Sequence, residues 1–173
     1  MGGIRGGEGR YLHIHPARMT LRKALKMGCE TNCPVEVLLV EDNLGDAKLT
    51  IEFLGVAGLP FRISVVRDGN EALLYLKKAD GYEHAAMPKL ILLDLRLPKR
   101  SGHEVLEAVR ADPKLACIPV IILTSSDSSI DRERSLQLGA NAFYTKPRNI
   151  GEWNRLTRCI AAFWSEHGLD RAC

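Results

Sequence analysis

The stretch LILLDLRLPKRSG, residues 90–102, decides how the rest of the sequence is interpreted. Leu90 to Leu93 form an uninterrupted apolar run, which is typical of a strand that is buried on both faces of a parallel sheet. Asp94 ends that run with a carboxylate. This residue either caps the strand in contact with water or lies, as a reactive group, at the mouth of a site. The ends of the other predicted strands distinguish these two possibilities.

The rest of the folded region alternates between strand and helix patterns. Apolar or alternating runs bounded by turn residues predict the strands, and apolar residues at helical spacing predict the helices. The first helix is expected to begin at Asp46 as its N-cap. Strands are predicted over 35–40, 61–66, 89–94, 118–125 and 141–147, and helices over about 46–58, 70–79, 103–112, 129–138 and 150–165.

Five strand–helix units in succession predict a parallel sheet with helices on both faces. The strands at 35–40, 89–94 and 118–125 are almost entirely apolar, as covered inner strands are. The alternating strand at 61–66 and the short, partly polar strand at 141–147 suit the edges. The strand order 2-1-3-4-5 places these two at the edges. We therefore expect an α/β protein with a doubly wound, five-stranded parallel sheet.

Composition and cysteine usage limit the class of protein. A chain of 173 residues with 46% hydrophobic and 26% charged residues is typical of one globular domain. No apolar stretch approaches the ~20 residues that a membrane helix needs, and the N-terminus lacks the apolar core of a signal peptide. Five cysteines, an odd number without a C-x-x-C pair, favour reduced thiols. We expect a cytoplasmic protein.

The net charge of +3 is unevenly distributed along the chain. Residues 1–34 carry six basic and two acidic residues, a net charge of +4, in a Gly-rich stretch with few apolar residues. This composition predicts a solvated, disordered tail rather than a specific nucleic-acid or membrane contact. We expect 1–34 to be a basic N-terminal tail, 35–167 to be the folded domain and 168–173 to be a short C-terminal tail.

Polar side chains occur at the carboxyl ends of four predicted strands. They are Glu41 with Asp42, Asp94, Thr124 and Lys146. In open parallel sheets the carboxyl ends of the strands line the ligand crevice. One such residue alone is more often structural than functional, but polar residues at four strand ends predict a site.

The residue types at these strand ends favour phosphoryl chemistry. Clustered carboxylates repel one another unless a cation lies among them, and oxygen ligands without histidine or cysteine favour Mg²⁺. Lys146 offers a positive charge to a phosphoryl oxygen, and Thr124 offers a hydroxyl. Asp94 follows a central strand and is the best-placed nucleophile, which would become an acyl phosphate.

Four segments resemble the motifs of response-regulator receiver domains of two-component signalling, and they occur in the family's order. The resemblance covers about residues 35–165. It implies the flavodoxin-like receiver fold and a phosphoryl group accepted from a sensor histidine kinase. The segments are VLLVEDN (37–43), LILLDLRLPKRSG (90–102), VIILTSS (120–126) and NAFYTKP (141–147).

The resemblance assigns ligand and acceptor roles to the acidic residues. It implies that Asp94 is the phosphoacceptor. It also implies that Mg²⁺ is bound by Glu41, Asp42, Asp94 and the backbone carbonyl of Arg96.

The resemblance also assigns roles to residues that respond to the phosphoryl group. Lys146 would pair with that group, Thr124 would hydrogen-bond to it, and the Lys146–Pro147 peptide would be cis. Phe143, three residues before the lysine, matches the switch aromatic of the family, and its ring would turn inward on phosphorylation.

A change at this site would be read out on the surface formed by 129–138, 141–147 and 150–165. Trp153 and Trp164 on the last helix exceed what one helix face is expected to bury. We therefore expect this surface to dock a kinase or to form a homodimer.

Within the family, the sequence is most similar to single-domain regulators paired with bacterial phytochromes. The features that carry this finer resemblance are LPKRSGHEVL (97–106), GYEHAAMP (81–88) and AAFW (161–164).

Two other classes of protein were weighed. A Mg²⁺-dependent phosphohydrolase also uses an aspartyl nucleophile, but such enzymes usually have a second carboxylate two residues later, where this chain has Arg96. A DNA-binding regulator would need an effector domain, and few residues follow 150–165. We expect a phosphorylatable switch rather than an enzyme.

Four remaining side chains receive structural interpretations. His84 and His103 are expected to face solvent, and Cys117 and Cys159 are expected to be small core residues.

Overall fold

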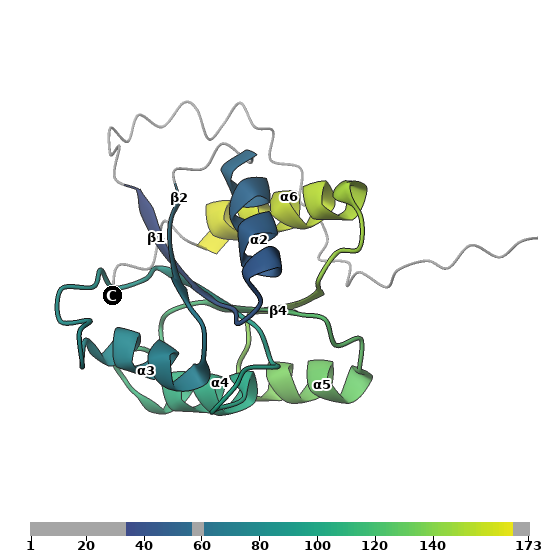
Figure 1. Ribbon diagram of the computed structural model, residues 1–173. Coiled ribbons are helices and arrows are strands. Elements are labelled where there is room, and N and C mark those ends of the chain that lie inside the picture. The colour runs from purple at the N-terminus through teal and green to yellow at the C-terminus, as the bar shows by residue number, and fades with distance from the viewer. Residues whose placement is uncertain (1–33, 57–60, 168–173) are drawn as a thin grey trace, which may run out of the picture. The chain divides into compact units, whose positions relative to one another are not determined.

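The computed structural model describes residues 34–56 and 61–167 (Figure 1). The expected tails therefore lie outside the described residues, apart from residue 34. The expected end of the first helix near Gly58 also lies outside them. No helix in the described ranges combines the length and apolarity needed to cross a membrane.

The described ranges contain five strands and five helices, in strict alternation along the chain. Each predicted element is present, with small shifts at its ends. The strands are β1 (Val35–Val40), β2 (Phe61–Val66), β3 (Leu90–Leu93), β4 (Val120–Thr124) and β5 (Ala142–Thr145). The helices are α2 (Leu44–Val56), α3 (Gly69–Lys77), α4 (Gly102–Ala111), α5 (Ser129–Gln137) and α6 (Ile150–His167).

The five strands form one parallel sheet in the order β2-β1-β3-β4-β5, which confirms the predicted topology. Helices α2 and α6 cover one face, and α3, α4 and α5 cover the other (Figure 1). In β1 the side chains alternate between these faces: Val37 and Leu39 pack with α2 and α6, whereas Leu38 and Val40 pack with α3 and α4. The inner strands are almost entirely apolar because both of their faces are covered.

The two tryptophans of α6 are buried, contrary to the expectation that they exceed one helix face. Trp153 is 5% exposed and Trp164 is 7% exposed. Trp153 stacks on Phe53 of α2 at 5.3 Å between ring centroids, and Trp164 meets the edge of Phe61 on β2 at 6.4 Å. Helix α6 packs against α2 as well as the sheet, so its buried face is wider than the sheet contact alone. The tryptophans therefore offer no surface for a partner.

Helix α2 begins earlier than predicted. The side-chain oxygen of Asn43 accepts hydrogen bonds from the backbone N–H groups of Gly45 (2.8 Å) and Asp46 (3.2 Å). Asn43 therefore satisfies the free N–H groups at the start of the helix. Asp46 is a residue of the first turn rather than the N-cap.

His103 also differs from expectation. It is buried, because its position in the first turn of α4 faces α5, where Nε2 lies 3.0 Å from the Ser135 hydroxyl. Cys117 packs against the core as expected. Cys159 is half-buried with a free thiol, and His84 is exposed as predicted.

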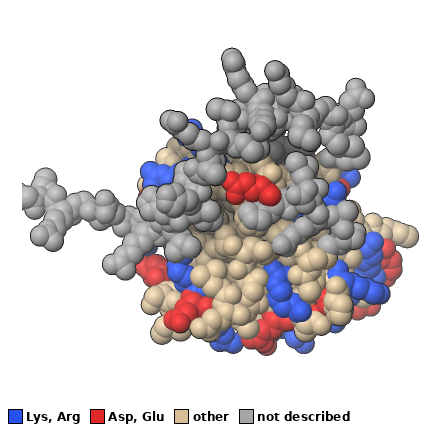
Figure 2. Space-filling view, turned by 180° about the vertical axis from the view of Figure 1, so that it is seen from behind, with Lys and Arg blue, Asp and Glu red and all other residues tan. Residues whose placement is uncertain are grey.

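Basic and acidic side chains are mixed on the surface. Figure 2 shows both signs interspersed along the lower part of the face seen from behind, next to an area of uncharged side chains. Nucleic-acid-binding domains instead gather basic residues on one face. This view of the described residues offers no such basic surface.

Candidate functional site

The carboxyl ends of four strands bring the predicted site residues to one edge of the sheet, which we call the rim: Glu41, Asp94, Thr124 and Lys146. Val40 pairs with Leu93 in the sheet, so Glu41 and Asp94 follow at the same level. The backbone N–H of Asp94 donates to the Val40 carbonyl (3.0 Å), and that of Lys146 donates to the Thr124 carbonyl (2.7 Å). These bonds extend the sheet pairing by one residue and fix the backbone positions of Asp94 and Lys146.

Lys146 connects the acidic side chains of the rim. Its ammonium nitrogen lies 2.6 Å from Glu41 Oε2, 2.6 Å from Asp94 Oδ2 and 2.9 Å from Asp46 Oδ2. The lysine side chain is only 7% exposed, so water screens these contacts poorly. The positive charge therefore offsets the repulsion among carboxylates that the sequence predicts for this edge.

Burial and charge act in opposite directions on the two most enclosed groups. Burial raises the pKa of the Glu41 carboxyl from its ordinary value to about 7, although the neighbouring Lys146 ammonium opposes the rise. Burial alone would lower the pKa of the Lys146 ammonium, but its ion pairs with Asp94 and Glu41 hold that pKa above its ordinary value. The lysine is therefore charged across the physiological range.

The acidic side chains suit a divalent cation. Carboxylate oxygens of Glu41, Asp42 and Asp94 all lie within 4.8 Å of one another, and all are oxygen ligands of the kind that Mg²⁺ prefers. Glu41 Oε2 is buried and makes no hydrogen bond among the described residues, since its contact with Lys146 is an ion pair without hydrogen-bond geometry. Asp42 is exposed. The donor set thus fits a cation that enters from the solvent side.

The loop after β3 turns back toward the phosphoacceptor candidate. The backbone N–H of Arg96 donates to Asp94 Oδ1 at 3.2 Å, while Asp94 Oδ2 faces Lys146. Each carboxylate oxygen of Asp94 thus has a different neighbour. The role of the Arg96 carbonyl as a metal ligand stays a prediction.

Thr124 is fully buried at the end of β4, and its hydroxyl oxygen accepts a hydrogen bond from the Ser126 N–H at 3.3 Å. Ser126 in turn donates to Asp131 on α5. The loop that follows Thr124 is thereby attached to the first turn of α5.

Phe143 already points inward. The ring is 5% exposed and belongs to the core on the face of the sheet that α3 and α4 cover. The guanidinium of Arg132 on α5 lies over the ring, 4.9 Å from its centroid. The ring thus lies inward in this structure, and its turn in response to phosphorylation stays a prediction.

The Lys146–Pro147 peptide is trans, contrary to the cis form that the resemblance implied. No cis peptide bond occurs in the described ranges. The trans form is the commoner state of an X–Pro bond, favoured by about 0.5–1 kcal/mol.

Asp46 is the site residue that sequence patterns missed. Its carboxylate reaches Lys146 from α2, one hundred residues away in the chain. The sequence offers an acidic residue at the start of a helix, which is typical of a structural role. Only the placement of α2 in the folded domain shows the contact.

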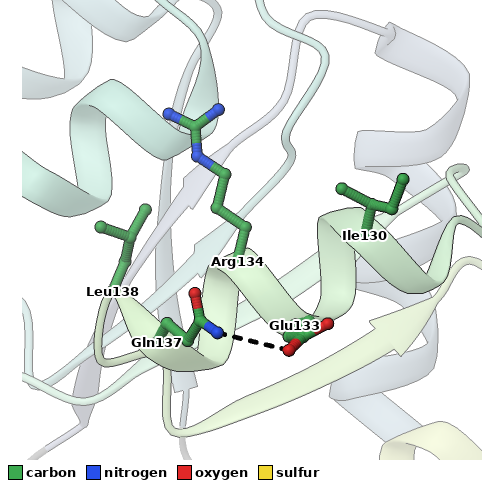
Figure 3. A pocket seen from close by; sticks show the side chains of 5 residues that line it. All are labelled: Ile130, Glu133, Arg134, Gln137 and Leu138. Atoms are coloured by element: carbon green, nitrogen blue, oxygen red, sulfur yellow. Dashed lines mark hydrogen bonds between the residues drawn. The ribbon is translucent and has the colours of Figure 1, made fainter.

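A separate hollow lies on the outer side of α5. Its walls combine apolar and charged side chains, and Gln137 donates to Glu133 one turn earlier on α5 (Figure 3). None of the rim residues lines it, so it is not the candidate site. The lining residues are Ile130, Glu133, Arg134, Gln137 and Leu138.

Comparison with known proteins identifies relatives of the whole described domain. The model of the response regulator receiver domain matches residues 37–157. The response regulator Rcp1 of Synechocystis sp. is 39% identical over 140 residues, which are 81% of this chain and 95% of Rcp1.

Solved structures of response regulators have the same fold as this chain. The phosphorylated cyanobacterial phytochrome response regulator RcpA superposes with a TM-score of 0.72 at 39% identity, covering 77% of this chain and 95% of RcpA. The Mn²⁺-bound form of Rcp1 superposes with a TM-score of 0.71 at 36% identity, covering 80% of this chain and 98% of that one.

Proposed function

Since the chain belongs to the response-regulator receiver family and is related to phytochrome response regulators, we propose that it accepts a phosphoryl group onto Asp94 from a sensor histidine kinase of the phytochrome class. The observation that carries this proposal is the position of the Lys146 ammonium, 2.6 Å from Asp94 Oδ2 on a buried rim. A fixed positive charge beside a carboxylate is the arrangement that phosphoryl transfer to that carboxylate requires.

Asp94 supplies the attacking oxygen. In the transfer, the bond between phosphorus and the histidine nitrogen of the kinase breaks, and a bond between phosphorus and a carboxylate oxygen of Asp94 forms. The imidazole keeps the electron pair of the broken bond. The Arg96 N–H, which donates to Asp94 Oδ1, orients the carboxylate so that it does not rotate freely during the attack.

Lys146 and Thr124 act on the phosphoryl oxygens. Lys146 is charged and held by carboxylates, so it can exchange a carboxylate partner for a phosphoryl oxygen without moving its backbone. Thr124 ends β4, which lies between the strands that lead to Asp94 and Lys146, and its hydroxyl becomes a donor to a phosphoryl oxygen when it rotates. Because the Ser126 N–H contacts that hydroxyl, rotation of Thr124 alters the loop that leads into α5.

Glu41, Asp42 and Asp94 would hold a divalent cation, with Mg²⁺ as the proposed physiological ion and the Arg96 carbonyl as an added ligand. Such an ion, when bound, offsets negative charge on the phosphoryl oxygens. The fit rests on the all-oxygen donor set, whose carboxylate oxygens lie within 4.8 Å of one another. The Mn²⁺-bound state of Rcp1 supports a divalent ion in a relative.

The residues around Asp94 favour this proposal over the phosphohydrolase alternative. A hydrolase of that kind needs an acid or base beside the leaving group, and the position two residues after Asp94 is the exposed Arg96. Ser126, two residues after Thr124, is already hydrogen-bonded to Asp131. We therefore propose a cytoplasmic switch that is not an enzyme and signals through its protein-binding surface. A homodimer through α5, β5 and α6 stays a prediction.

Labelling with a small phosphodonor tests the proposal. We expect acetyl phosphate to label the full chain only when a divalent cation is present, and Asp94→Asn to abolish the label. The matched control is Asp80→Asn, which removes the same charge from an exposed site in the connection between α3 and β3 and should label like the parent chain. Full labelling of Asp94→Asn would contradict the assignment.

A further inference from the structure

Lys146 has one partner that the roles described so far do not use. Asp46 Oδ2 lies 2.9 Å from the ammonium nitrogen and belongs to α2, not to the carboxyl end of a strand. Its side chain is 32% exposed, whereas that of Asp94 is 5% exposed. The ammonium group has three hydrogens, and three carboxylates surround it.

The backbone around Asp46 fixes where its carboxylate points. The Asp46 N–H donates to Asn43 Oδ1 at 3.2 Å, and its carbonyl accepts from the buried Thr50 hydroxyl at 2.8 Å. Ala47 is buried under the same turn. An acidic residue in the first turn stabilises a helix through the helix dipole, but that effect needs no contact with Lys146. The ion pair is therefore an additional property of this position.

The three partners of Lys146 are not equivalent. Glu41 and Asp94 belong to the carboxylate cluster that fits a cation, whereas Asp46 does not. Glu41 Oε2 lies 2.6 Å from Lys146, so this oxygen can approach a cation only after the lysine has left it. When it leaves Glu41, Lys146 keeps two carboxylate partners, Asp46 and Asp94.

We propose that Asp46 is a positioning residue that holds the Lys146 ammonium beside Asp94 when Glu41 turns to a divalent cation. This inference rests on the proposed function of the rim. Without Asp46, the lysine would lose half of the carboxylate contacts that remain to it, and it would compete more strongly with the cation for Glu41. Asp46 thus lowers the cost of cation binding through Lys146, without touching the cation.

A double-mutant cycle tests this role. Calorimetric titration with Mg²⁺ would compare the full-length parent, Asp46→Asn, Lys146→Gln and the double variant. We expect Asp46→Asn to raise the dissociation constant about fivefold in the parent chain, and by less than about twofold once Lys146 is already replaced. The smaller increase, in the chain without Lys146, comes only from the long-range influence of one lost negative charge on the cation.

Two further variants separate the contact from charge and fold. Glu52→Gln removes an exposed negative charge from the same helix and should change the dissociation constant by less than about twofold. Asp46→Glu restores the charge on a longer side chain and should recover part of the affinity. Urea unfolding without Mg²⁺ shows whether each variant is folded at the temperature of the titration.

The inference would be overturned if Asp46→Asn changed the Mg²⁺ dissociation constant equally with and without Lys146, or changed it in neither chain. If Asp46→Asn does not fold, the same comparison made with Asp46→Ser, which also removes the carboxylate, decides. Acetyl phosphate labelling of the parent chain keeps the two proposals apart. A parent chain that takes no label at Asp94 overturns the proposed function, whereas a labelled parent with an additive cycle overturns only the role of Asp46.

Discussion

Gly102 lies directly against the backbone of Asp94. A Cβ atom built on Gly102 would lie 2.2 Å from the Asp94 carbonyl oxygen and 2.7 Å from Leu95 Cα. The Gly102 N–H also donates to the Leu95 carbonyl at 3.0 Å. Both close atoms belong to the backbone, which cannot rotate aside as a flexible side chain can. Glycine therefore allows α4 to begin against the residue that we propose as the phosphoacceptor.

Replacing this glycine should disturb both stability and the site. Gly102→Ala forces α4 away from the strand end, and we expect it to lower the free energy of unfolding by about 1–3 kcal/mol, as overpacking does. Urea unfolding measures the loss. Gly55→Ala is the control, because a Cβ on Gly55 in α2 meets no atom within 4 Å. That variant should be neutral or more stable by up to about 1 kcal/mol. Equal stability of Gly102→Ala and the parent would show that α4 does not need this contact.

The cation should stabilise the fold because it binds only the folded arrangement of Glu41, Asp42 and Asp94. At a hundred times its dissociation constant, Mg²⁺ should add about 2.7 kcal/mol to the free energy of unfolding. Asp42→Asn removes the exposed ligand and should lose most of that increment, while Asp80→Asn should keep it. Urea unfolding with and without MgCl₂ checks this. If Mg²⁺ did not change the free energy of unfolding of the parent chain, the carboxylates would not form a metal site.

Asp68 predicts how stability depends on pH. Its Oδ1 caps α3 through the Glu71 N–H (2.8 Å), and its Oδ2 pairs with the Lys99 ammonium. The hydrogen bond from Lys99 lowers the pKa of the Asp68 carboxyl in the folded protein. The stability from this group is therefore complete above its unfolded pKa of about 3.9 and is lost as the pH falls through the lower folded pKa.

Asp68→Asn keeps a side-chain acceptor for the cap but removes the charge. We expect its free energy of unfolding to fall less steeply than that of the parent as the pH is lowered from about 5 to about 3. Denaturant unfolding at several pH values measures the slope, with Asp80→Asn as the control for loss of an exposed carboxylate. The same slope in Asp68→Asn and the parent would refute the coupling to Lys99.

Trp164 should matter for folding rather than for association. Trp164 is buried and makes a T-shaped contact with the Phe61 ring. Trp164→Ala therefore leaves a cavity and should lower the free energy of unfolding by about 3–5 kcal/mol. The control is Ile130→Ala on α5, where the side chain is 75% exposed and the expected change is within about 0.5 kcal/mol. Chemical unfolding measures both variants. A stable Trp164→Ala chain with an altered sedimentation profile would restore the idea of an interface at this residue.

The fold could be predicted from the sequence because burial left a clear pattern in each strand. The runs at 35–40, 90–93 and 120–124 are almost entirely apolar, and the structure places them in the middle of the sheet. The alternating strand at 61–66 and the short strand at 142–145 are at the edges. Helix ends were less accurate, since Asn43 and Asp46 are both acceptable N-caps and only the hydrogen bonds distinguish them.

The site was only partly predictable, for a related reason. Glu41, Asp94 and Lys146 follow predicted strands, so the topology alone brings them to one rim. Asp46 belongs to a helix, and its distance from Lys146 depends on how α2 packs on the sheet. The burial of His103 likewise depends on how α4 faces α5. Local sequence patterns carry no information about these helix placements.

The most direct test of the central claim is to locate the phosphoryl group on the chain. After treatment with acetyl phosphate and Mg²⁺, reduction with borohydride converts a phosphorylated aspartate to homoserine, which peptide mass spectrometry can assign to a position. The account predicts the conversion at Asp94 and at none of the neighbouring acidic residues Glu41, Asp42 and Asp46, which contact the same lysine or belong to the same carboxylate cluster. Conversion at Asp42 or Asp46, with Asp94 unmodified, would contradict it.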